Sequence, residues 1–501
     1  MILSLFFNNF KKKNMQFAKP AHKILLTLTG VFFLIQTNVF GQEQKYYPDP
    51  DTLVQKKLEQ WQDLKFGLLM HWGPYSQRSI VESWSICPED VGWATGARVK
   101  QGAENYFEYL KNYEDLKKTF NPTNFDPEKW AQAAKDAGMK YVIFTTKHHD
   151  GFCMFDTKYT DYKITDKDCP FSSNPRSNVT KEIFDAFRKD NFMIGAYFSK
   201  PDWHSNYYWW KRFPPVDRNV NYSIALHPEQ WQKFVDFVHN QVNELMTGYG
   251  KIDILWLDGG WVRKKTDEEI KEEFLQNMKD KLSVFNSQSQ DINMPLLVKE
   301  ARAKQPGLIV VDRAVEGPQQ NYLTPEQYIP ATGLPYPWET CMTMGNSWSY
   351  VKGDIYKPAD ELIKKLVDIV SKGGNYLLNI GPGPDGEWDP IAYSRLKEIG
   401  VWMKQNGEAI YGTRMYKVYG EGDNIRYTQT KDGKTKFIFL MQFPDQRVVL
   451  TKMQLEKKSR LQMIGSKKKL NWKQTTGGVE ISVPEDLKSV SNHVWVIKVT
   501  G

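Results

Sequence analysis

The 501-residue sequence has few cysteines and no long apolar runs, and both scarcities exclude whole classes of protein. Four cysteines in a chain of this length do not form a disulfide scaffold, and no Cys-x-x-Cys pair indicates a zinc site. The longest candidate membrane segment, Ile24–Ile35, holds 12 residues, whereas a transmembrane helix needs about 20. A polytopic membrane protein is therefore excluded.

The excess of positive charge is small once the N-terminus is set aside. The formal net charge is +8, but residues 1–41 contain five lysines and no acidic residue. Without them, 62 basic residues face 59 acidic ones, a net charge of +3. The lysine runs at 11–13 and 467–469 are too short to form the concentrated basic face of a nucleic-acid-binding protein, so no nucleic-acid partner is expected.

The N-terminus has the order of an export signal. Lys19 and Lys23 precede the apolar run, and small and polar residues follow it up to Gly41. We expect residues 1–41 to be a signal peptide. If residues 1–14 come from a misassigned start site, the signal peptide begins at Met15. The mature protein would then be periplasmic or secreted and not membrane-associated. An uncleaved N-terminal anchor is the alternative.

Export bears on the state of the four cysteines, because an exported protein can oxidise them. Cys153 and Cys169 bracket one loop and could pair. Four free buried thiols are at least as compatible with the sequence.

Between about residues 60 and 400, short apolar stretches alternate with amphipathic ones. Six stretches have the continuous apolar character of strands buried on both faces: Phe66–Met70, Tyr141–Thr146, Met193–Phe198, Ile252–Leu257, Leu308–Val311 and Tyr376–Ile380. The stretches between them, such as Pro228–Met246, show helical spacing of apolar residues. Repeated strand–helix units predict an α/β fold, a (β/α)8-like barrel. Because six strands are found and not eight, we expect the barrel to be imperfect.

A doubly wound sheet is the competing architecture. No Gly-x-Gly-x-x-Gly follows a predicted strand, which weakens it. From about Gly412 the pattern changes to five short strands without a helix, which predicts a small antiparallel β-sandwich. The predicted domains are therefore a barrel over residues 42–408 and a sandwich over residues 409–501.

Polar and aromatic side chains follow five of the predicted barrel strands, where such folds place their active sites. They are His71 and Trp72, then Lys147, His148, His149 and Asp150, then Asp202, Trp203 and His204, then Asp258 and Trp261, and finally Asp312 and Arg313. Their recurrence at successive strand ends predicts a binding pocket with chemistry at that end of the barrel.

Asp258 is the strongest candidate for a catalytic group. The strand Ile252–Leu257 aims its carboxylate at the predicted pocket beside Trp256, although an Asp-Gly turn is the simpler alternative. His148 and His149 could bind a metal with a nearby carboxylate, but neutral imidazoles also suit sugar hydroxyls, because they both donate and accept hydrogen bonds.

Glycoside hydrolysis would need a second carboxyl group, with a raised pKa if it is to be protonated near neutral pH. The candidates after Arg313 are Glu316, Glu326 and Glu339. Glu326 follows a Thr-Pro opening, and Glu339 lies against Trp338, a setting that could raise its pKa. The residues alone do not rank the three.

Together these residues resemble the α-L-fucosidases of glycoside hydrolase family 29. The resemblance rests on Lys65–Ser76, Tyr141–Thr157, Ile252–Gly260, Val310–Arg313, Pro337–Thr343 and Gly373–Gly386. It implies a β/α-barrel-like catalytic domain, a C-terminal β-sandwich, and an exo-acting enzyme that removes α-linked L-fucose from glycans with retention. It implies no metal and no cofactor. The KHHDGF, WLDGG and WETCMT motifs are similar to those of the broad-substrate branch of the family.

The resemblance also implies roles for particular residues. Asp258 would be the nucleophile, and Glu326 the acid/base, with Glu339 as the second choice. The residues that would bind the fucose are His71, Trp84, His148, His149, Trp256 and Arg313. Three rival functions stay open: a metal-dependent hydrolase using His148, His149 and Asp258, a barrel glycosidase for another sugar such as a galactoside, and a non-catalytic sugar-binding protein.

Overall fold

The computed structural model of the chain describes residues 45–89, 94, 105–280 and 287–501. The predicted signal peptide, residues 1–41, lies outside these residues. Within the described ranges, no helix combines the length and apolar character needed to cross a membrane. All four cysteines are free and buried, so the structure contains no Cys153–Cys169 disulfide.

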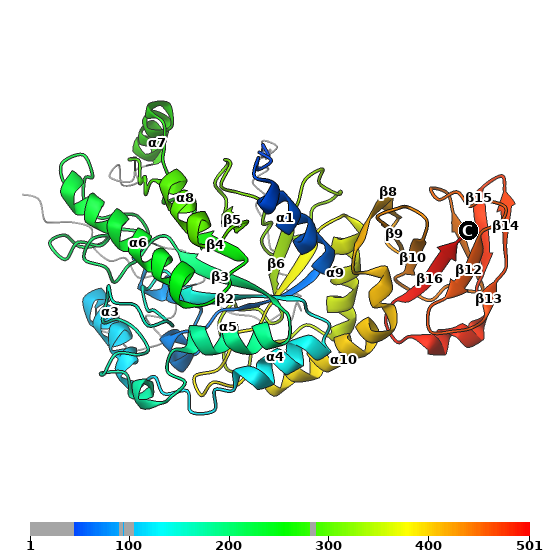
Figure 1. Ribbon diagram of the computed structural model, residues 1–501, viewed down its shortest axis with the longest axis horizontal. Helices are drawn as coiled ribbons and strands as arrows, with labels where there is room; N and C mark the ends of the chain where they lie inside the picture. The colour runs from blue at the N-terminus through cyan, green and yellow to red at the C-terminus, as the bar shows by residue number, and fades with distance from the viewer. Residues whose placement is uncertain (1–44, 90–93, 95–104, 281–286) are drawn as a thin grey trace, which may run out of the picture. The chain divides into compact units, whose positions relative to one another are not determined.

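A sheet of seven parallel strands forms the centre of the larger part of the protein (Figure 1). The strands are β1 (Phe66–Met70), β2 (Tyr141–Lys147), β3 (Met193–Ser199), β4 (Ile254–Asp258), β5 (Ile309–Asp312), β6 (Glu339–Thr343) and β7 (Asn375–Asn379). Their order in the sheet is β5-β4-β3-β2-β1-β7-β6. The six predicted strands are confirmed to within two residues at each end. Strand β6 was not predicted, because Glu339, Thr340 and Thr343 interrupt any apolar run.

An irregular segment, residues 319–327, occupies the space between the edge strands β5 and β6. Asn321 donates its backbone N–H to the carbonyl of Val310 in β5 at 2.9 Å. Further along, Glu339 in β6 donates to Leu323 at 2.8 Å, and Gln327 donates to Cys341 at 2.9 Å. The segment thus bonds both edges of the curled sheet, which confirms the expectation of an imperfect barrel.

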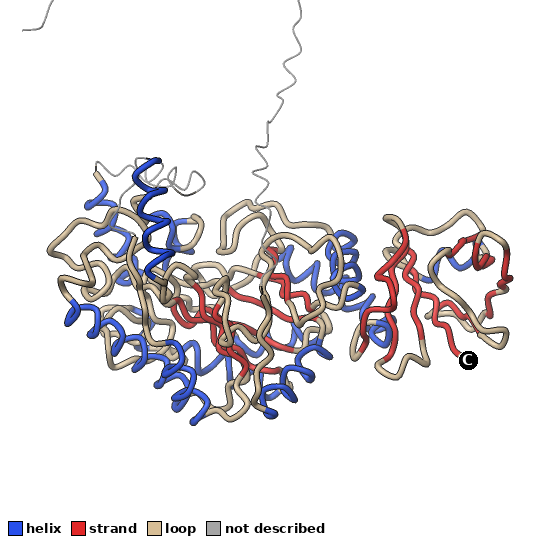
Figure 2. The backbone as a smooth tube through the Cα atoms, turned by 90° about the horizontal axis from the view of Figure 1, so that it is seen from above, coloured by secondary structure: helices blue, strands red, loops and turns tan. Residues whose placement is uncertain are grey.

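Helices surround the sheet, and most of them cover its outer face (Figures 1 and 2). Their bounds are α1 (Thr52–Leu64), α3 (Tyr106–Glu114), α4 (Pro127–Asp136), α5 (Val179–Lys189), α6 (Pro228–Gly248), α7 (Asp267–Asp280), α8 (Met294–Lys304), α9 (Ala359–Ser371) and α10 (Pro390–Asn406). Helix α5 shows why they pack this way: Ile183, Phe184 and Phe187 recur at helical spacing and are fully buried. Such an apolar stripe is stable only against another apolar surface, here the outer face of the strands.

The C-terminal part consists of antiparallel strands in two sheets, as predicted. Strands β8 (Thr413–Glu421), β9 (Ile425–Thr430), β10 (Lys436–Leu440), β12 (Arg460–Met463), β13 (Lys469–Leu470) and β16 (Trp495–Thr500) form one sheet. Strands β11 (Arg447–Leu450), β14 (Trp472–Thr475) and β15 (Gly478–Ser482) form the other. Side chains such as Tyr427, Ile438 and Ile481 form a core of their own between these sheets.

The barrel and the sandwich are joined by specific bonds. Trp402 of α10 donates its indole N–H to the carbonyl of Val494 at 2.9 Å, and Arg426 of β9 pairs with Asp368 of α9. Residues 45–501 form one compact unit. The division at residues 408 and 409 therefore stays a prediction.

Close packing inside the barrel predicts that Gly67→Ala will destabilise the protein. Gly67 lies in β1, and a Cβ atom there would overlap the aromatic ring of Tyr141. Overpacking of this kind costs about 1–3 kcal/mol, so the melting temperature should fall. Gly248→Ala, at the end of α6, is the matched control, because a Cβ there meets no atom within 4 Å. Equal melting temperatures for both variants would contradict the packing argument.

Candidate active site

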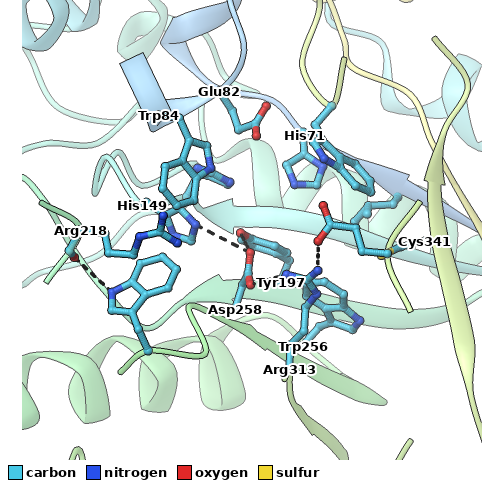
Figure 3. Close-up of a pocket in the computed structure, with 15 residues that line it drawn as sticks. His71, Glu82, Trp84, His149, Tyr197, Arg218, Trp256, Asp258, Arg313 and Cys341 are labelled. Carbon is cyan, nitrogen blue, oxygen red and sulfur yellow. Dashed lines mark hydrogen bonds and ion pairs between the residues drawn. The ribbon is translucent and has the colours of Figure 1, made fainter. Parts of the chain in front are cut away.

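The C-terminal ends of the strands surround a cavity of about 370 Å³ (Figure 3). Of the nine site residues predicted from the sequence, eight line it: His71, Trp84, His148, His149, Trp256, Asp258, Arg313 and Glu326. The ninth, Glu339, does not. Glu316, the third acid/base candidate, is not among the lining residues either; its carboxylate accepts a hydrogen bond from Tyr47 at 3.2 Å.

Asp258, the last residue of β4, has four partners around its carboxylate. Arg313 lies 3.0 Å from Oδ1, which also accepts the backbone N–H of Gly259 at 2.8 Å. Tyr197 of β3 donates its hydroxyl to Oδ2 at 2.8 Å, and Nε2 of His149 lies 3.8 Å from the same oxygen. Both oxygens are therefore held in a fixed orientation.

These partners determine the charge of Asp258. Burial alone would raise the pKa of its carboxyl group. The positive charge of Arg313, the neighbouring imidazole of His149 and the hydrogen bonds from Tyr197 and Gly259 together outweigh that effect. The pKa of Asp258 consequently lies well below its ordinary value. A carboxylate that stays ionised at every working pH is suited to act as a nucleophile.

Three histidines form part of the buried floor of the cavity. Burial lowers the pKa of His71 and of His149 to about 4, and it lowers the pKa of His148 well below its ordinary value. Nδ1 of His71 lies 2.8 Å from Oδ1 of Asn379, and Nδ1 of His148 lies 2.5 Å from the hydroxyl of Ser83. The three imidazoles are thus neutral near pH 7, and two of them are fixed in orientation by a polar neighbour.

Glu326 lies at the end of the irregular segment between β5 and β6. Its side chain is 39% exposed and pairs with Nη2 of Arg313, while Nη1 of the same guanidinium contacts Asp258. One planar group therefore holds two carboxylates at the same cavity. Glu326 is the more exposed of the two, since the Asp258 side chain is only 14% exposed.

Glu339 lies elsewhere, at the start of β6 and therefore at the opposite end of the strand from the cavity. It is fully buried and accepts the hydroxyl of Tyr141 at 2.5 Å and the indole N–H of Trp256 at 3.4 Å. Burial raises its pKa to about 7. The raised pKa expected for this carboxyl group is present, but the group does not line the cavity.

Several strand-end residues singled out in the sequence do not join the cavity. Asp202 pairs with buried Lys147 at 3.1 Å, and Asp150 accepts the hydroxyl of Tyr113 at 2.8 Å. Asp312 pairs with Lys200, and Trp72 packs among aromatic rings such as Trp130. Asp312 lies in β5 next to Arg313, and its side chain points away from the cavity, as alternation along a strand requires. The other three residues follow the ends of their strands and are held by partners outside the cavity.

The sequence reasoning missed several residues that line the cavity: Leu69, Glu82, Tyr197, Arg218, Cys341 and Trp348. Burial raises the pKa of Glu82 to about 8, so this carboxyl group is neutral near pH 7. Glu82 immediately precedes the second short helical turn after β1, Ser83–Ile86, whose residue Trp84 was predicted to line the pocket. The alternation of side chains along β3 could have indicated that Tyr197 faces the cavity. Arg218 lies in a long loop, and no pattern in the sequence indicates that it lines the cavity.

Among the described residues, one group of three could hold a metal ion: His148, His149 and Asp258. The arrangement fits a divalent cation poorly. Arg313 already places a positive charge 3.0 Å from Asp258, and Tyr197 donates to its second oxygen. A metal ion would have to displace these contacts or accept the repulsion of the guanidinium.

The buried histidines predict a loss of stability in acid. An unfolded histidine has a pKa of about 6.5, whereas His71 has a pKa of about 4 in the folded protein. Between these values the unfolded chain binds more protons, so the free energy of unfolding falls as the pH decreases from about 6.5 to about 4. Each such histidine contributes at most about 1.4 kcal/mol per pH unit.

The variant His71→Asn should lack the part of this pH dependence that comes from His71. In denaturant titrations, the difference in unfolding free energy between wild type and variant should be constant above about pH 6.5 and shrink towards pH 4. A difference that stays the same throughout would show that His71 does not titrate as its burial requires.

Two family models and several known proteins match the sequence of this chain. The family model described as "Alpha-L-fucosidase" matches residues 33–408, and that described as "Alpha-L-fucosidase C-terminal domain" matches residues 421–500. Tissue alpha-L-fucosidase of Rattus norvegicus is 29% identical over 469 residues, covering 91% of this chain and 92% of its own. Tissue alpha-L-fucosidase of Homo sapiens is 28% identical over 505 residues, covering 97% of each chain.

Solved structures of α-L-fucosidases have a similar fold. Alpha-L-fucosidase isoenzyme 1 from Paenibacillus thiaminolyticus is 28% identical, with a TM-score of 0.70 over 90% of this chain and 99% of that one. The Thermotoga maritima alpha-fucosidase in complex with fucose is 26% identical, with a TM-score of 0.68 over 91% and 100%. Both domains of the chain are thus matched in sequence, and its fold is matched as a whole: the protein belongs to the α-L-fucosidase family.

Proposed function

We propose that this protein is a retaining, exo-acting α-L-fucosidase that hydrolyses terminal α-linked L-fucose from glycans or glycoconjugates. The observation that carries the proposal is the shared contact of Arg313 with Asp258 and Glu326 at one cavity, in a chain of the α-L-fucosidase family. Retaining glycosidases need two carboxyl groups about 5–5.5 Å apart. Two carboxylates held by one guanidinium are compatible with that spacing.

Asp258 acts as the nucleophile and attacks the anomeric carbon of the bound fucose. Its ionised state and its fixed orientation, from Arg313, Tyr197 and the Gly259 N–H, prepare it for this step. The attack produces a covalent fucosyl-enzyme and releases the aglycone.

Glu326 serves as the acid/base. It protonates the leaving oxygen in the first step and removes a proton from the attacking water in the second. Both transfers require Glu326 to turn from Arg313 towards the substrate, and its partial exposure gives it room to do so. Glu339, the second choice, is less suitable, because Tyr141 and Trp256 enclose it away from the cavity.

The remaining predicted residues bind the sugar. His71, His148 and His149 are neutral, so each can donate one hydrogen bond and accept another, as a hydroxyl group requires. Trp84 and Trp256 offer aromatic faces to the ring carbons and the methyl group of fucose. A methyl contact of this kind contributes about 1–3 kcal/mol of discrimination against sugars that lack it.

A metal-dependent hydrolase is the second candidate function, and the spacing of His148, His149 and Asp258 is the observation in its favour. The guanidinium of Arg313 beside Asp258 weighs against it. We therefore propose catalysis without a metal or other cofactor.

Location and substrate range belong to the same proposal. Residues 1–41 direct export, and the mature protein acts in the periplasm or outside the cell. Residues 42–408 supply the catalytic barrel and residues 409–501 the C-terminal sandwich. The KHHDGF, WLDGG and WETCMT motifs favour the broad-substrate branch of the family.

Replacing the nucleophile tests the first step. Asp258→Asn keeps the side-chain shape but removes the charge, so kcat on an aryl α-L-fucoside should fall by about three orders of magnitude or more. Turnover by the wild type should be unchanged in EDTA. Near-wild-type activity in Asp258→Asn, with an unchanged melting temperature, would remove Asp258 from its role. Loss of wild-type activity in EDTA would favour the metal-dependent alternative.

Azide distinguishes the two acid/base candidates. Glu326→Gln should still form the fucosyl-enzyme from a fucoside with a good aryl leaving group, but water should release it slowly. Azide needs no general base, so adding it should restore turnover and yield α-fucosyl azide. Glu339→Gln should not respond to azide. The opposite pattern would exchange the roles of the two residues.

A further inference from the structure

The residues that line the cavity fall into a buried floor and a partly exposed rim. Eight floor side chains are buried, among them the three histidines, Tyr197 and Trp256. Trp84, Arg218 and Trp261 are only partly buried. Trp84 and Arg218 lie at one side of Asp258 (Figure 3), and the ring of Trp261 lies beside the Arg218 guanidinium. Under the proposed function, fucose occupies the floor, so the aglycone must leave along the rim.

The main chain of Arg218 is held rigidly at this rim. Its carbonyl oxygen accepts three side-chain donors: Trp203 at 3.2 Å, Tyr208 at 3.0 Å and Trp261 at 3.1 Å. Tyr208 and Trp203 are buried, so the carbonyl is anchored on the core of the protein. This single loop position is therefore fixed although it lies in the long connection between β3 and α6.

The guanidinium of Arg218 is equally constrained. Nε and Nη2 each donate to the carboxylate of Glu89 at 2.7 Å. The group also lies over two rings, 4.8 Å from the centre of Trp84 and 5.3 Å from the centre of Trp261. Held in this way, Arg218 loses little side-chain entropy when it binds a ligand.

One nitrogen of this group has no partner among the described residues. Nη1 of Arg218 bonds no residue in the described part of the chain, and the side chain lines the cavity. Figure 3 shows the guanidinium reaching towards His149 and Asp258. The two tryptophan rings beside it offer apolar faces of the kind on which sugar rings stack.

The charge of the pair limits what it would bind. Glu89 offsets the charge of Arg218, so the free N–H groups suit a neutral oxygen better than an anion. An aryl aglycone offers no such acceptor near the glycosidic bond, whereas a sugar offers hydroxyl and ring oxygens.

We propose that Arg218, held by Glu89 between Trp84 and Trp261, recognises the aglycone and selects fucosides whose leaving group is a neutral sugar. The inference rests on the proposed fucosidase function and adds the substrate class. It assigns Arg218 a specificity-determining role and leaves the chemical step to Asp258 and Glu326.

The test compares two substrates, an aryl α-L-fucoside and an α-L-fucosyl-galactose disaccharide. Arg218→Met keeps the aliphatic stem but removes the donors, and a hydrogen bond from a charged donor is worth about tenfold or more in binding. We expect kcat/KM for the disaccharide to fall by about tenfold or more, mainly through KM, and kcat/KM for the aryl fucoside to change by less than about threefold.

Two further variants serve as a check and a control. Glu89→Gln weakens the anchor of Arg218 without altering the cavity wall, so it should cause a smaller loss of the same selectivity. Arg212→Met is the matched control, because Arg212 lies in the same loop over the rings of Trp210 and Phe213 but does not line this cavity. Arg212→Met should leave kcat/KM for both substrates unchanged. The melting temperatures of all variants are compared with that of the wild type, to show that each variant is folded.

Each other outcome is decisive. An equal loss on both substrates would place Arg218 in the fucose subsite and overturn the inference, while an unchanged ratio with full activity would remove the role altogether. Failure of the wild type to hydrolyse either substrate would instead contradict the proposed function, and the inference would fall with it.

Discussion

The arrangement of the cavity depends on the ion pair between Arg313 and Asp258. A buried carboxylate without a partner would become protonated or destabilise the fold, because removing an ionised group from water costs several kcal/mol. The guanidinium of Arg313 lies 3.0 Å from Asp258 and itself lies over the ring of Trp256. Its second nitrogen orients Glu326 at the same opening. One side chain thus keeps the proposed nucleophile ionised and places the proposed acid/base beside it.

The same burial that is costly for a carboxylate is useful for the histidines. His71, His148 and His149 are neutral because desolvation disfavours their charged forms. Neutral rings do not compete with Arg313 for Asp258, and they keep an acceptor nitrogen that an imidazolium lacks. The floor of the cavity is therefore rich in neutral hydrogen-bonding groups, and the ion pair of Asp258 and Arg313 lies beside it. That combination suits an uncharged sugar with several hydroxyl groups.

Rigidity at the rim comes from a different source. The floor is positioned by consecutive parallel strands, whose register places Ser199 opposite Asp258 and Trp256 opposite Val311. Arg218 belongs to a loop, and its place depends on the three donors that meet at its carbonyl oxygen. The floor is thus positioned by strands and the rim by a loop that is fixed at one carbonyl oxygen. In the functions proposed above, the first binds the sugar to be cleaved and the second the rest of the glycan.

The sequence alone determined the strand ends and much of what they carry. Six apolar stretches were recognisable as strands, and Asp258, His148 and His149 follow them directly, so their meeting at one edge required only the parallel order of the sheet. The resemblance to a known family made Glu326 the first choice among three candidate acids, and it added Trp84 and the identity of the sugar.

Only the tertiary structure shows that Glu326 lines the cavity and that Glu339 does not. The strand β6 begins at Glu339, which buries that carboxyl group at the far end of the barrel, whereas the irregular segment before it carries Glu326 to the opening. The places of Tyr197 and Arg218 were likewise settled by folding. Strand alternation and neighbouring residues are encoded locally, but the meeting of side chains from distant loops depends on how the barrel closes, which no short stretch of sequence specifies.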